Sequence, residues 1–393
     1  MPLSRLARFA LLPELFLKKM WQERGTCWFE AEKTSDFEVC PKCAKACSGV
    51  YDRRIVTLRD RPLDGRLVQI RIRKRRFWCR DCKKPFTEPL NGVSKGQRTT
   101  QRYRKYLLWA CETFCDLKRV REHMRCSYGL VYKALYEQLD LELRKRKYPW
   151  PKSIGIDEHK FKRDPRGGWP IFATAVVDHT NKRLYELVEG RTQDDLFDGL
   201  HAIPGRENVQ LVTMDLCQPF RKFVSGFFPN AKIVADKFHV VRLLHPAINA
   251  QRKKVAGHWR KNPIGRLLIK DSRKLQFHER RAIWAWLAHH ADMKELYEAK
   301  EAMHSFYRIK GYDKAAKALT KLCDHLGQSK LKPLKTLRRT LMIWRKEILN
   351  YFNHRITNGR TEGYNGKAKL VKRKAYGYRS FTNYRLRVLN ACT

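Results

Sequence analysis

An alternation of strand and helix patterns in residues 151–250 most constrains the fold of this chain. It opens where Ile154 and Ile156 alternate with Gly155 and Asp157, which is the period of a half-buried strand. The carboxylate stands at the end of this pattern. Because open α/β sheets bind ligands and metals at the carboxyl ends of their strands, the pattern predicts a sheet with a functional site at one edge.

Turn residues divide this region into three strands, a helix and then two strand–helix pairs. Strands are expected at 153–160, 170–177, 183–189, 209–214 and 231–235, and helices at 193–201, 219–228 and around 240–248. This is the order of the RNase H-like fold, in which the fourth strand lies beside the first. The predicted fold class is therefore α/β (α+β), with an RNase H-like catalytic core.

Carboxylates end several of these patterns. Asp215 ends the fourth strand, Asp236 ends the fifth, and Glu362 lies in a glycine-rich segment. Because the fourth strand should lie beside the first, Asp157 and Asp215 should project from adjacent strand ends. Asp236 should lie one strand further away, so Asp215 is preferred as the second carboxylate, while Asp236 and Glu158 remain candidates.

Three converging carboxylates predict a metal-dependent phosphoryl-transfer site. Oxygen ligands suit Mg²⁺ (or Mn²⁺), and two such ions about 3.5–4 Å apart can hold the attacking and the leaving oxygen at phosphorus. A single acidic residue is more often a surface or salt-bridge group. The combination of Asp157, Asp215 and Glu362 weakens that alternative.

The net charge of +45 indicates a polyanionic partner. Self-repulsion of this size works against a compact state, whereas neutralising phosphates and releasing counterions favours binding to nucleic acid. Ribosomal-type and membrane-surface binders are also basic, but 10 Trp, 19 Phe and the strand patterns favour an enzyme-sized core. No apolar stretch approaches the ~20 residues needed to span a bilayer, so the expected partner is double-stranded DNA and not a membrane.

Two CxxC pairs fall in an N-terminal region expected to span residues 1–95. Each pair places two thiolates on one tight turn, and two such turns complete a tetrahedral Zn²⁺ site. The loop between them, residues 44–78, is longer than usual. Cys27 and Cys47 are therefore possible substitute ligands, and free buried thiols are the alternative. The proposed ligands are Cys40, Cys43, Cys79 and Cys82.

Inside that loop, Val68, Ile70 and Ile72 alternate with polar and cationic residues. The pattern predicts a strand with one apolar face and one cationic face, which would contact DNA phosphates. The alternative is a solvated edge strand whose charges prevent aggregation. The arginines expected to contact DNA are Arg71, Arg73, Arg75 and Arg76.

Residues 96–148 are expected to form a helix-turn-helix region. Helices are predicted at 103–114 and 116–123, a three-residue turn follows, and Ser127 can cap a third helix that runs to about Leu139. The alternative is a helical linker bundle packed on the catalytic domain. The side chains expected to face the DNA groove are Tyr128, Tyr132 and Lys133.

Residues 149–393 are expected to form the catalytic domain. Within it, residues 251–350 are basic and show helical rather than strand patterns, which predicts a helical insertion between the second and third carboxylates. Beyond Glu362, basic residues at helical spacing, including Lys367 and Lys369, should lie against a phosphate backbone.

Several motifs, in one order, resemble the ISL3 family of DDE-type bacterial insertion-sequence transposases, and the resemblance covers nearly the whole chain. They are the cysteine finger at 40–82, the helix-turn-helix, GIDE at 155–158, VTMD at 212–215, ADKFHVV at 235–241 and TNGRTEGYNGKAK at 357–369.

The resemblance implies that Asp157, Asp215 and Glu362 form the catalytic triad. Asp236 and His239 match the D-x-x-H element of transposases that carry a helical insertion. It further implies that the N-terminal modules recognise terminal inverted repeats, and that water cuts the element's end before its 3′-hydroxyl joins another strand. A homo-oligomer in the synaptic complex, and a cytoplasmic, nucleoid-associated location in a bacterium, are expected by the same analogy.

Two other functions remain open at this point. One is an RNase H-fold nuclease that cuts without strand transfer, which observed joining of 3′-hydroxyl ends would exclude. The other is a catalytically silent zinc and helix-turn-helix regulator that only binds DNA. The intact set of two aspartates and a glutamate argues against that regulator, because a silent protein has no reason to keep it.

Overall fold

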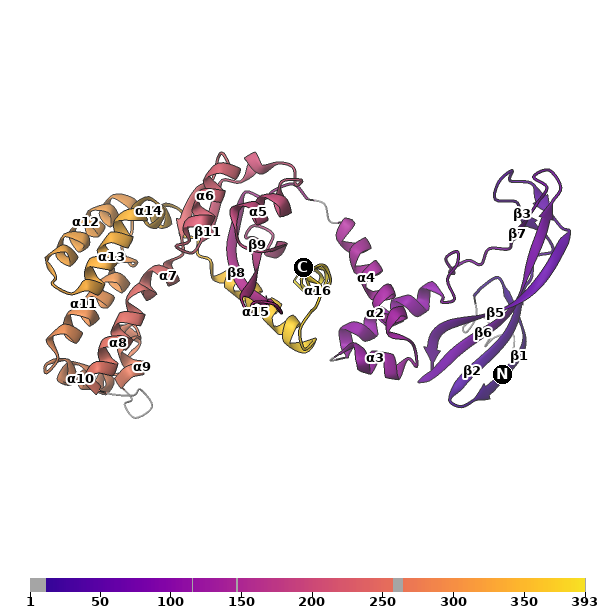
Figure 1. Cartoon of the computed structure of the whole chain (residues 1–393), viewed down its shortest axis with the longest axis horizontal. Coiled ribbons are helices and arrows are strands. Elements are labelled where there is room, and N and C mark those ends of the chain that lie inside the picture. The colour runs from indigo at the N-terminus through magenta and orange to yellow at the C-terminus, as the bar shows by residue number, and fades with distance from the viewer. Residues whose placement is uncertain (1–11, 115, 146–147, 257–263, 393) are drawn as a thin grey trace. The chain divides into compact units, whose positions relative to one another are not determined.

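Figure 1 shows the computed structural model of the chain, which describes residues 12–114, 116–145, 148–256 and 264–392. The chain divides into two compact units, Met1–Lys145 and Arg146–Thr393. The second unit begins close to the expected start of the catalytic domain, and the further boundary expected near residue 95 stays a prediction. Among the described residues, no helix has the length and apolar character needed to cross a membrane.

The first unit is built on a five-stranded sheet and a small two-stranded sheet. The strands are β1 (Leu15–Glu23), β2 (Thr26–Lys33), β3 (Glu38–Val39), β4 (Ala46–Cys47), β5 (Val50–Leu63), β6 (Arg66–Cys79) and β7 (Lys84–Thr87). The larger sheet has the order β1–β2–β6–β5, with β7 paired to β6. Its long hairpin turns at Asp64 and Gly65, whose φ angles of +48° and +71° fit a two-residue turn that matches the twist of the strands.

The alternation predicted inside the cysteine loop is confirmed on β6. Val68, Ile70 and Ile72 are buried, while Arg71 is half-buried and Arg73 exposed on the opposite face. The buried face packs on Phe29 and Leu58 in one apolar cluster, which fixes the register of the sheet because a one-residue slip would expose it.

Three helices follow this sheet in the first unit. They are α2 (Gln101–Thr113), α3 (Leu117–His123) and α4 (Tyr128–Arg144). The predicted cap is confirmed, since the Ser127 hydroxyl accepts from Leu130 N, and Asp116 caps α3 in the same way. The last helix continues past Leu139 because Asp140 and Arg144 bridge its final turns at 2.8 Å and no Gly or Pro interrupts them.

The second unit is centred on a five-stranded mixed sheet. Its strands are β8 (Ser153–Arg163), β9 (Pro170–Asp178), β10 (Arg183–Glu189), β11 (Leu211–Met214) and β12 (Lys232–Ala235). The order is β10–β9–β8–β11–β12; the first three strands are antiparallel, and β8, β11 and β12 run parallel. The prediction that the fourth strand lies beside the first is therefore confirmed.

Helices cover both faces of this sheet. On one face, α5 (Gln193–Leu200) and α6 (Gln218–Phe227) pack Leu196 and Phe220 into the same core as Ile156. On the other face lie α15 (Gly359–Lys374) and α16 (Phe381–Ala391), where the ring of Tyr384 stacks on Phe161 with centroids 5.0 Å apart. Alternation along β8 explains this division, because successive side chains point to opposite faces.

The described residues of the predicted insertion, with a little chain on either side, are helical and contain no strand. The helices are α7 (Lys237–Val241), α8 (His245–Ala256), α9 (Ile264–Leu268), α10 (Phe277–Leu287), α11 (Ala291–Phe306), α12 (Tyr312–Gln328), α13 (Lys332–Ile343) and α14 (Arg345–His354). Short 3-10 turns lie at Arg206–Asn208, Arg242–Leu244 and Ser272–Lys274. The insertion shares one buried core with the sheet, and Asn350 Nδ2 on α14 donates to Ile233 O of β12 at 2.8 Å.

Candidate active site

Three aspartates stand in one row across the parallel strands, directly after the last paired residues of β8, β11 and β12. Strands β11 and β12 end there, but β8 continues past Asp157 to Arg163, so the expectation that Asp157 ends its strand is wrong. The register pairs Met214 of β11 with Ile156 of β8 on one side and with Ala235 of β12 on the other. The next residue along each strand direction is an aspartate: Asp157, Asp215 and Asp236. This register places Asp157, Asp215 and Asp236 on neighbouring strands, while the convergence of Asp157, Asp215 and Glu362 stays a prediction.

His239 lies against two neighbouring carboxylates of this row, Asp215 and Asp236. Its Nδ1 lies 2.7 Å from Asp215 Oδ1 and 3.0 Å from Asp236 Oδ2, because the first turn of α7 places it three residues after Asp236. The two carboxylates, Asp215 first, raise the pKa of His239 to about 10. The expectation that Asp236 lies one strand further than Asp215 from Asp157 is confirmed by the order β8–β11–β12, and one imidazole lies against both Asp215 and Asp236.

The same three side chains form a group that could hold a metal ion. Their ligand atoms lie within 4.8 Å of one another, and Asp236 is buried while Asp215 and His239 are partly exposed. The Nδ1 hydrogen of His239 is directed at Asp236, so Asp215 Oδ1 is buried without a hydrogen-bond donor. The His239 imidazole lies 2.7 Å from this oxygen, and a divalent cation would satisfy the oxygen's remaining lone pairs.

Asp157 is held by a chain of buried hydrogen bonds. Its Oδ2 accepts from Asn365 Nδ2 at 2.7 Å and its Oδ1 from the backbone N of Glu158 at 2.8 Å. Asn365 Oδ1 lies 2.8 Å from His159 Nδ1, whose Nε2 lies 2.7 Å from the Tyr384 hydroxyl. Because Asn365 Oδ1 can only accept, His159 carries its hydrogen on Nδ1 and accepts from Tyr384.

In the absence of a cation, the environment of Asp157 makes its carboxylate easier to protonate than that of an ordinary aspartate. Burial, and then the charge of Asp215, raises the pKa of Asp157 to about 6. A cation at the row would oppose both effects, since opposite charge favours the ionised carboxylate. Glu158, the next residue along β8, lies on the other face of the strand, where it approaches Arg191 at 3.7 Å.

The start of α15 is docked onto the sheet by Asn358. Its backbone N donates to Asp236 Oδ1 at 3.0 Å and its Nδ2 to Ile156 O at 3.3 Å. Its Oδ1 accepts from the Thr213 hydroxyl at 2.9 Å, which is 2.7 Å from His179 Nε2. One asparagine therefore ties the helix to all three parallel strands of the row.

Glu362 lies in the first turn of α15 and is exposed. It stands three residues before Asn365, which places both on neighbouring positions of one helix face. Among the described residues, however, neither Glu362 nor Asp157 belongs to the compact ligand group of Asp215, Asp236 and His239. The fold thus brings Glu362 to the helix that covers Asp157 but does not bring its carboxylate into that group.

The sequence patterns did not identify the residues that position this site. Asn358, Thr361 and Asn365 are buried and follow helical spacing on the face of α15 that meets the sheet. A signal for them existed, because three polar residues at i, i+3 and i+7 form one helix stripe. The hydrogen-bond partners of Asn358 and Asn365 lie some 120 to 210 positions earlier, and Thr361 Oγ1 is buried without a hydrogen-bond partner. The stripe alone therefore could not identify these contacts.

Some of the residues expected to contact DNA are already held by other side chains of the first unit, and the others are exposed. Arg75 Nε binds Glu88 at 2.9 Å and Arg76 binds Asp52 at 2.8 Å, so both take part in ion pairs within their own unit. Arg71 lies over the rings of Trp21 and Trp28, at 5.3 and 5.6 Å from their centroids.

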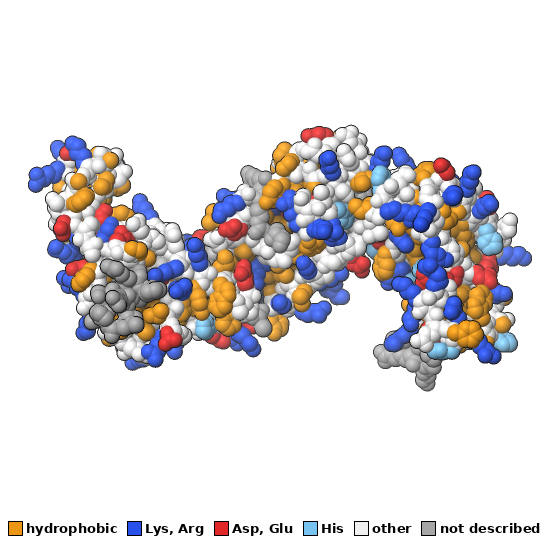
Figure 2. Space-filling model, turned by 180° about the vertical axis from the view of Figure 1, so that it is seen from behind, with side chains coloured by type: hydrophobic (Ala, Val, Ile, Leu, Met, Phe, Trp, Pro, Cys, Tyr) orange, Lys and Arg blue, Asp and Glu red, His pale blue; other side chains and the backbone are white. Residues whose placement is uncertain are grey.

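The remaining members of that set reach the surface. Arg73 is exposed on β6, and Tyr128, Tyr132 and Lys133 are exposed on α4, with Lys133 3.8 Å from Glu137. Lys367 and Lys369 are exposed on α15. Figure 2 shows lysine and arginine side chains spread along the visible face of the molecule rather than in one patch.

A four-cysteine cluster lies at the end of the first unit's long hairpin. Cys40 and Cys82 Sγ are 3.9 Å apart, and Cys43 and Cys79 Sγ 3.5 Å apart. An ion with four sulfur ligands at about 2.3 Å sets neighbouring sulfurs about 3.8 Å apart, so the cluster has the size of such a site. The backbone N–H of Cys82, and then neighbouring thiols, lower the pKa of Cys79 to about 6.

The alternative ligands weighed from the sequence do not enter this cluster. Cys47 is buried beside it but its Sγ contacts Lys45 O at 3.6 Å, and Cys27 lies on β2. The predicted set of Cys40, Cys43, Cys79 and Cys82 is the one that the fold assembles.

Comparison with known proteins places the chain in a class. Residues 154–388, which contain the whole row of carboxylates, match a family model described as a transposase. This protein belongs to the ISL3 family of insertion-sequence transposases. The transposase for insertion sequence element IS1001 of Bordetella parapertussis is 25% identical over 371 residues, covering 90% of this chain and 89% of that protein. Transposases for element IS1557 of two Mycobacterium tuberculosis strains are 26% identical over 302 residues, 68% of this chain and 66% of theirs.

Proposed function

We propose that this protein binds the terminal inverted repeats of an insertion sequence and catalyses strand cleavage and strand transfer by a DDE mechanism. The observation that carries the proposal is the row of Asp157, Asp215 and Asp236 in the register of three parallel strands. The strand order, three antiparallel strands followed by two parallel ones beside the first, supports an RNase H-like core. Membership of a transposase family supplies the reaction class.

In this proposal Asp157, Asp215 and Glu362 are the catalytic carboxylates. Bound Mg²⁺ or Mn²⁺ would supply Lewis-acid stabilisation of the attacking and leaving oxygens at phosphorus. The donor set fits such ions, since Asp215 Oδ1 is buried without a hydrogen-bond donor. Asn365 and the backbone N of Glu158 hold Asp157 in one orientation. Glu362, exposed on the helix that covers Asp157, would complete the set.

Asp236 and His239 act as positioning residues in this scheme. Asp236 is 4% exposed, and its two oxygens already bind Asn358 N and His239 Nδ1. It therefore anchors the helix that carries Glu362, while His239 keeps Asp215 facing the row. Loss of either should weaken catalysis less than loss of a catalytic carboxylate.

The first unit would provide specific binding to the element's ends. The four-cysteine cluster would hold Zn²⁺ and fix the open end of the β5–β6 hairpin, where β6 ends at Cys79. Tyr128, Tyr132 and Lys133 on α4 would face the groove as the recognition helix of a helix-turn-helix, with Arg73 on phosphate. Because two ends must be brought together for strand transfer, the working form would be a homo-oligomer on DNA. Action on bacterial DNA would place it in the cytoplasm, at the nucleoid.

The test is cleavage and strand transfer on labelled element-end DNA with Mg²⁺. Alanine variants of Asp157, Asp215 and Glu362 should lose both steps, while Asp236→Ala should retain part of the activity. Asp198→Ala, on the exposed face of α5, removes one carboxylate that is not part of the row and serves as the control. Thermal unfolding of each variant separates loss of chemistry from loss of fold.

Three results would overturn parts of this proposal. Full loss in Asp236→Ala with activity kept in Asp215→Ala would show that the catalytic pair is wrongly chosen. Cleavage without joining of 3′-hydroxyl ends would make the protein a nuclease. Specific end binding by an inert wild type would make it a DNA-binding regulator.

A further inference from the structure

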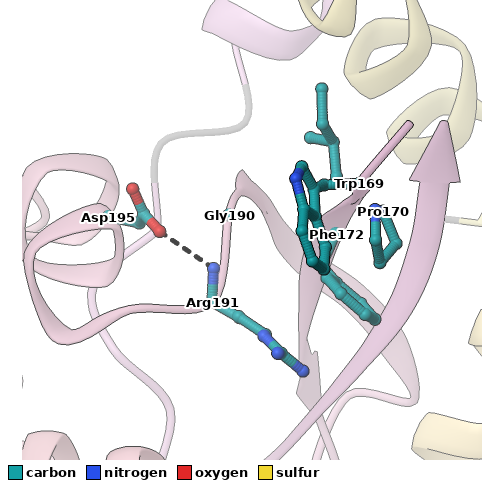
Figure 3. A pocket seen from close by; sticks show the side chains of 7 residues that line it. Trp169, Pro170, Phe172, Gly190, Arg191 and Asp195 are labelled. Atoms are coloured by element: carbon teal, nitrogen blue, oxygen red, sulfur yellow. Dashed lines mark hydrogen bonds between the residues drawn. The ribbon is translucent and has the colours of Figure 1, made fainter. Parts of the chain in front are cut away.

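A cavity of about 300 Å³ lies beside the β8–β9 hairpin, away from the row of carboxylates (Figure 3). Figure 3 shows the aromatic and proline side chains on one side and a turn leading into α5 on the other. Trp169 is 76% exposed, which is unusual for so large an apolar side chain. The principal lining residues are Trp169, Pro170, Ile171, Phe172, Arg191 and Asp195.

The hairpin holds Trp169 in place although the ring is exposed. Asp164 N donates to Trp169 O at 2.8 Å, and Gly168 N donates back to Asp164 O at 2.9 Å. Gly168 has φ +67°, and a side chain at Gly167 would lie 2.7 Å from the indole Cδ1. The ring therefore packs on a bare glycine in a closed turn and presents its other face to solvent.

The opposite wall is equally well fixed. Gly190 has φ +96°, and a Cβ there would lie too close to the Asp195 carboxylate. Asp195 Oδ2 accepts from Arg191 N at 3.0 Å and from Thr192 N at 2.9 Å. From this capped turn the Arg191 guanidinium reaches over the Phe172 ring, 4.1 Å from its centroid.

Arg191 also links the cavity to the active site. It lies 3.7 Å from Glu158, the residue after Asp157. Asp157 pairs with Ala175 across the hairpin, and Phe172 and Trp169 follow three and six positions away. At ~3.3 Å per residue, they lie about 10 and 20 Å from Asp157 along the strands. Because three positions separate Phe172 from Ala175, its ring lies on the Glu158 face of the sheet and not on the Asp157 face. A stacked strand that passes from Asp157 along the Glu158 side would span this length with about three to six nucleotides at ~3.4 Å each.

The charge around the cavity suits a phosphate backbone. The hairpin segment 160–169 carries four basic residues and one acidic residue. Flat aromatic faces beside cations are the platform on which single-stranded nucleic acid stacks its bases. The volume lies at the small end of the range for ligand pockets, which matches one flat ring system rather than a protein segment.

We propose that this cavity binds an unpaired nucleobase of the DNA strand that the active site handles, stacked on Trp169 with its phosphate near Arg191. The inference rests on the proposed function, since it assumes that DNA reaches Asp157. Its role would be to hold the strand in register three to six nucleotides from the cut phosphate. A duplex end that frays or is opened at this position would supply the base.

The test uses the full-length protein with element-end DNA carrying 2-aminopurine at successive positions. The fluorescence of one base, about three to six nucleotides from the cut, should change on binding, and Trp169→Ala should abolish that change. Trp169→Phe keeps an aromatic face and should restore it. Phe277→Ala removes another side chain that is 76% exposed, on α10, and is the matched control.

We expect Trp169→Ala to weaken binding of single-stranded DNA by about 5- to 150-fold, the range measured for loss of one stacked base. Equal fluorescence changes in wild type and Trp169→Ala, with normal cleavage, would refute the cavity's role and leave the proposed function intact. A base signal lost in Trp169→Ala in a protein that never cuts would refute the proposed function instead. If Trp169→Ala alters only self-association without DNA, the cavity is a protein interface and the inference fails.

Discussion

Gly155 is the position at which the addition of a single methyl group should impair catalysis more than it impairs folding. A Cβ at this residue would lie 2.1 Å from Thr361 Oγ1, 2.7 Å from Asn358 Oδ1 and 2.7 Å from His179 Nε2. All three neighbours are buried, so none can swing into solvent. Gly155→Ala must therefore push the start of α15 away from β8.

The cost follows from these contacts. Overpacking a tight core costs about 1–3 kcal/mol, and displacing the Asn358 amide from Thr213 and Ile156 O loses about 1 kcal/mol more. We expect Gly155→Ala to lower the free energy of unfolding by about 2–4 kcal/mol. For a unit of this size that is a fall in Tm of about 4–16 °C. Because Glu362 moves with α15, the cleavage rate should fall by a larger factor than the loss of folded protein alone would produce.

The assay is thermal unfolding beside end cleavage and end binding. Gly226→Ala is the matched control, since its Cβ would meet nothing within 4 Å and alanine favours a helix; it should be neutral or slightly stabilising. End binding should survive Gly155→Ala because it is assigned to the first unit. A variant with wild-type Tm and wild-type cleavage would refute the steric reasoning.

Three further predictions address other parts of the chain. Cys40→Ser, or a zinc chelator, should weaken specific end binding while leaving a metal-dependent nick on pre-cut DNA largely intact; equal loss of both would indicate a global folding role. Burial lowers the pKa of His179 to about 4, so its contribution to stability is complete above its ordinary pKa of about 6.5 and is lost as pH falls toward 4. Between pH 7 and pH 5, the free energy of unfolding measured with urea should fall by about 2 kcal/mol more for wild type than for His179→Gln. An equal fall in both proteins would contradict this prediction. Gly366 is exposed in α15 with open space around it, so Gly366→Ala should add about 0.5–1 kcal/mol of stability yet reduce cleavage if a DNA backbone approaches there; unchanged cleavage would argue against that approach.

Local sequence pattern determined the elements and the residues worth testing. The alternation in β8 and β6, the cap at Ser127 and the paired cysteines are set by neighbours within a few positions. Period and turn chemistry report such neighbours directly. The order of the elements, which is that of the RNase H-like fold, also predicted that Asp157 and Asp215 lie on adjacent strands.

The partners of those residues were decided by the tertiary structure. The register that aligns Asp157, Asp215 and Asp236, and the bonds from Asn358 and Asn365 across the sheet, join positions distant in the chain. The same holds for Arg75, which looked like a free cation on β6 but meets Glu88, buried at 0% exposure. A buried polar group must find a partner wherever packing offers one, and the pattern along a single strand or helix does not contain that choice.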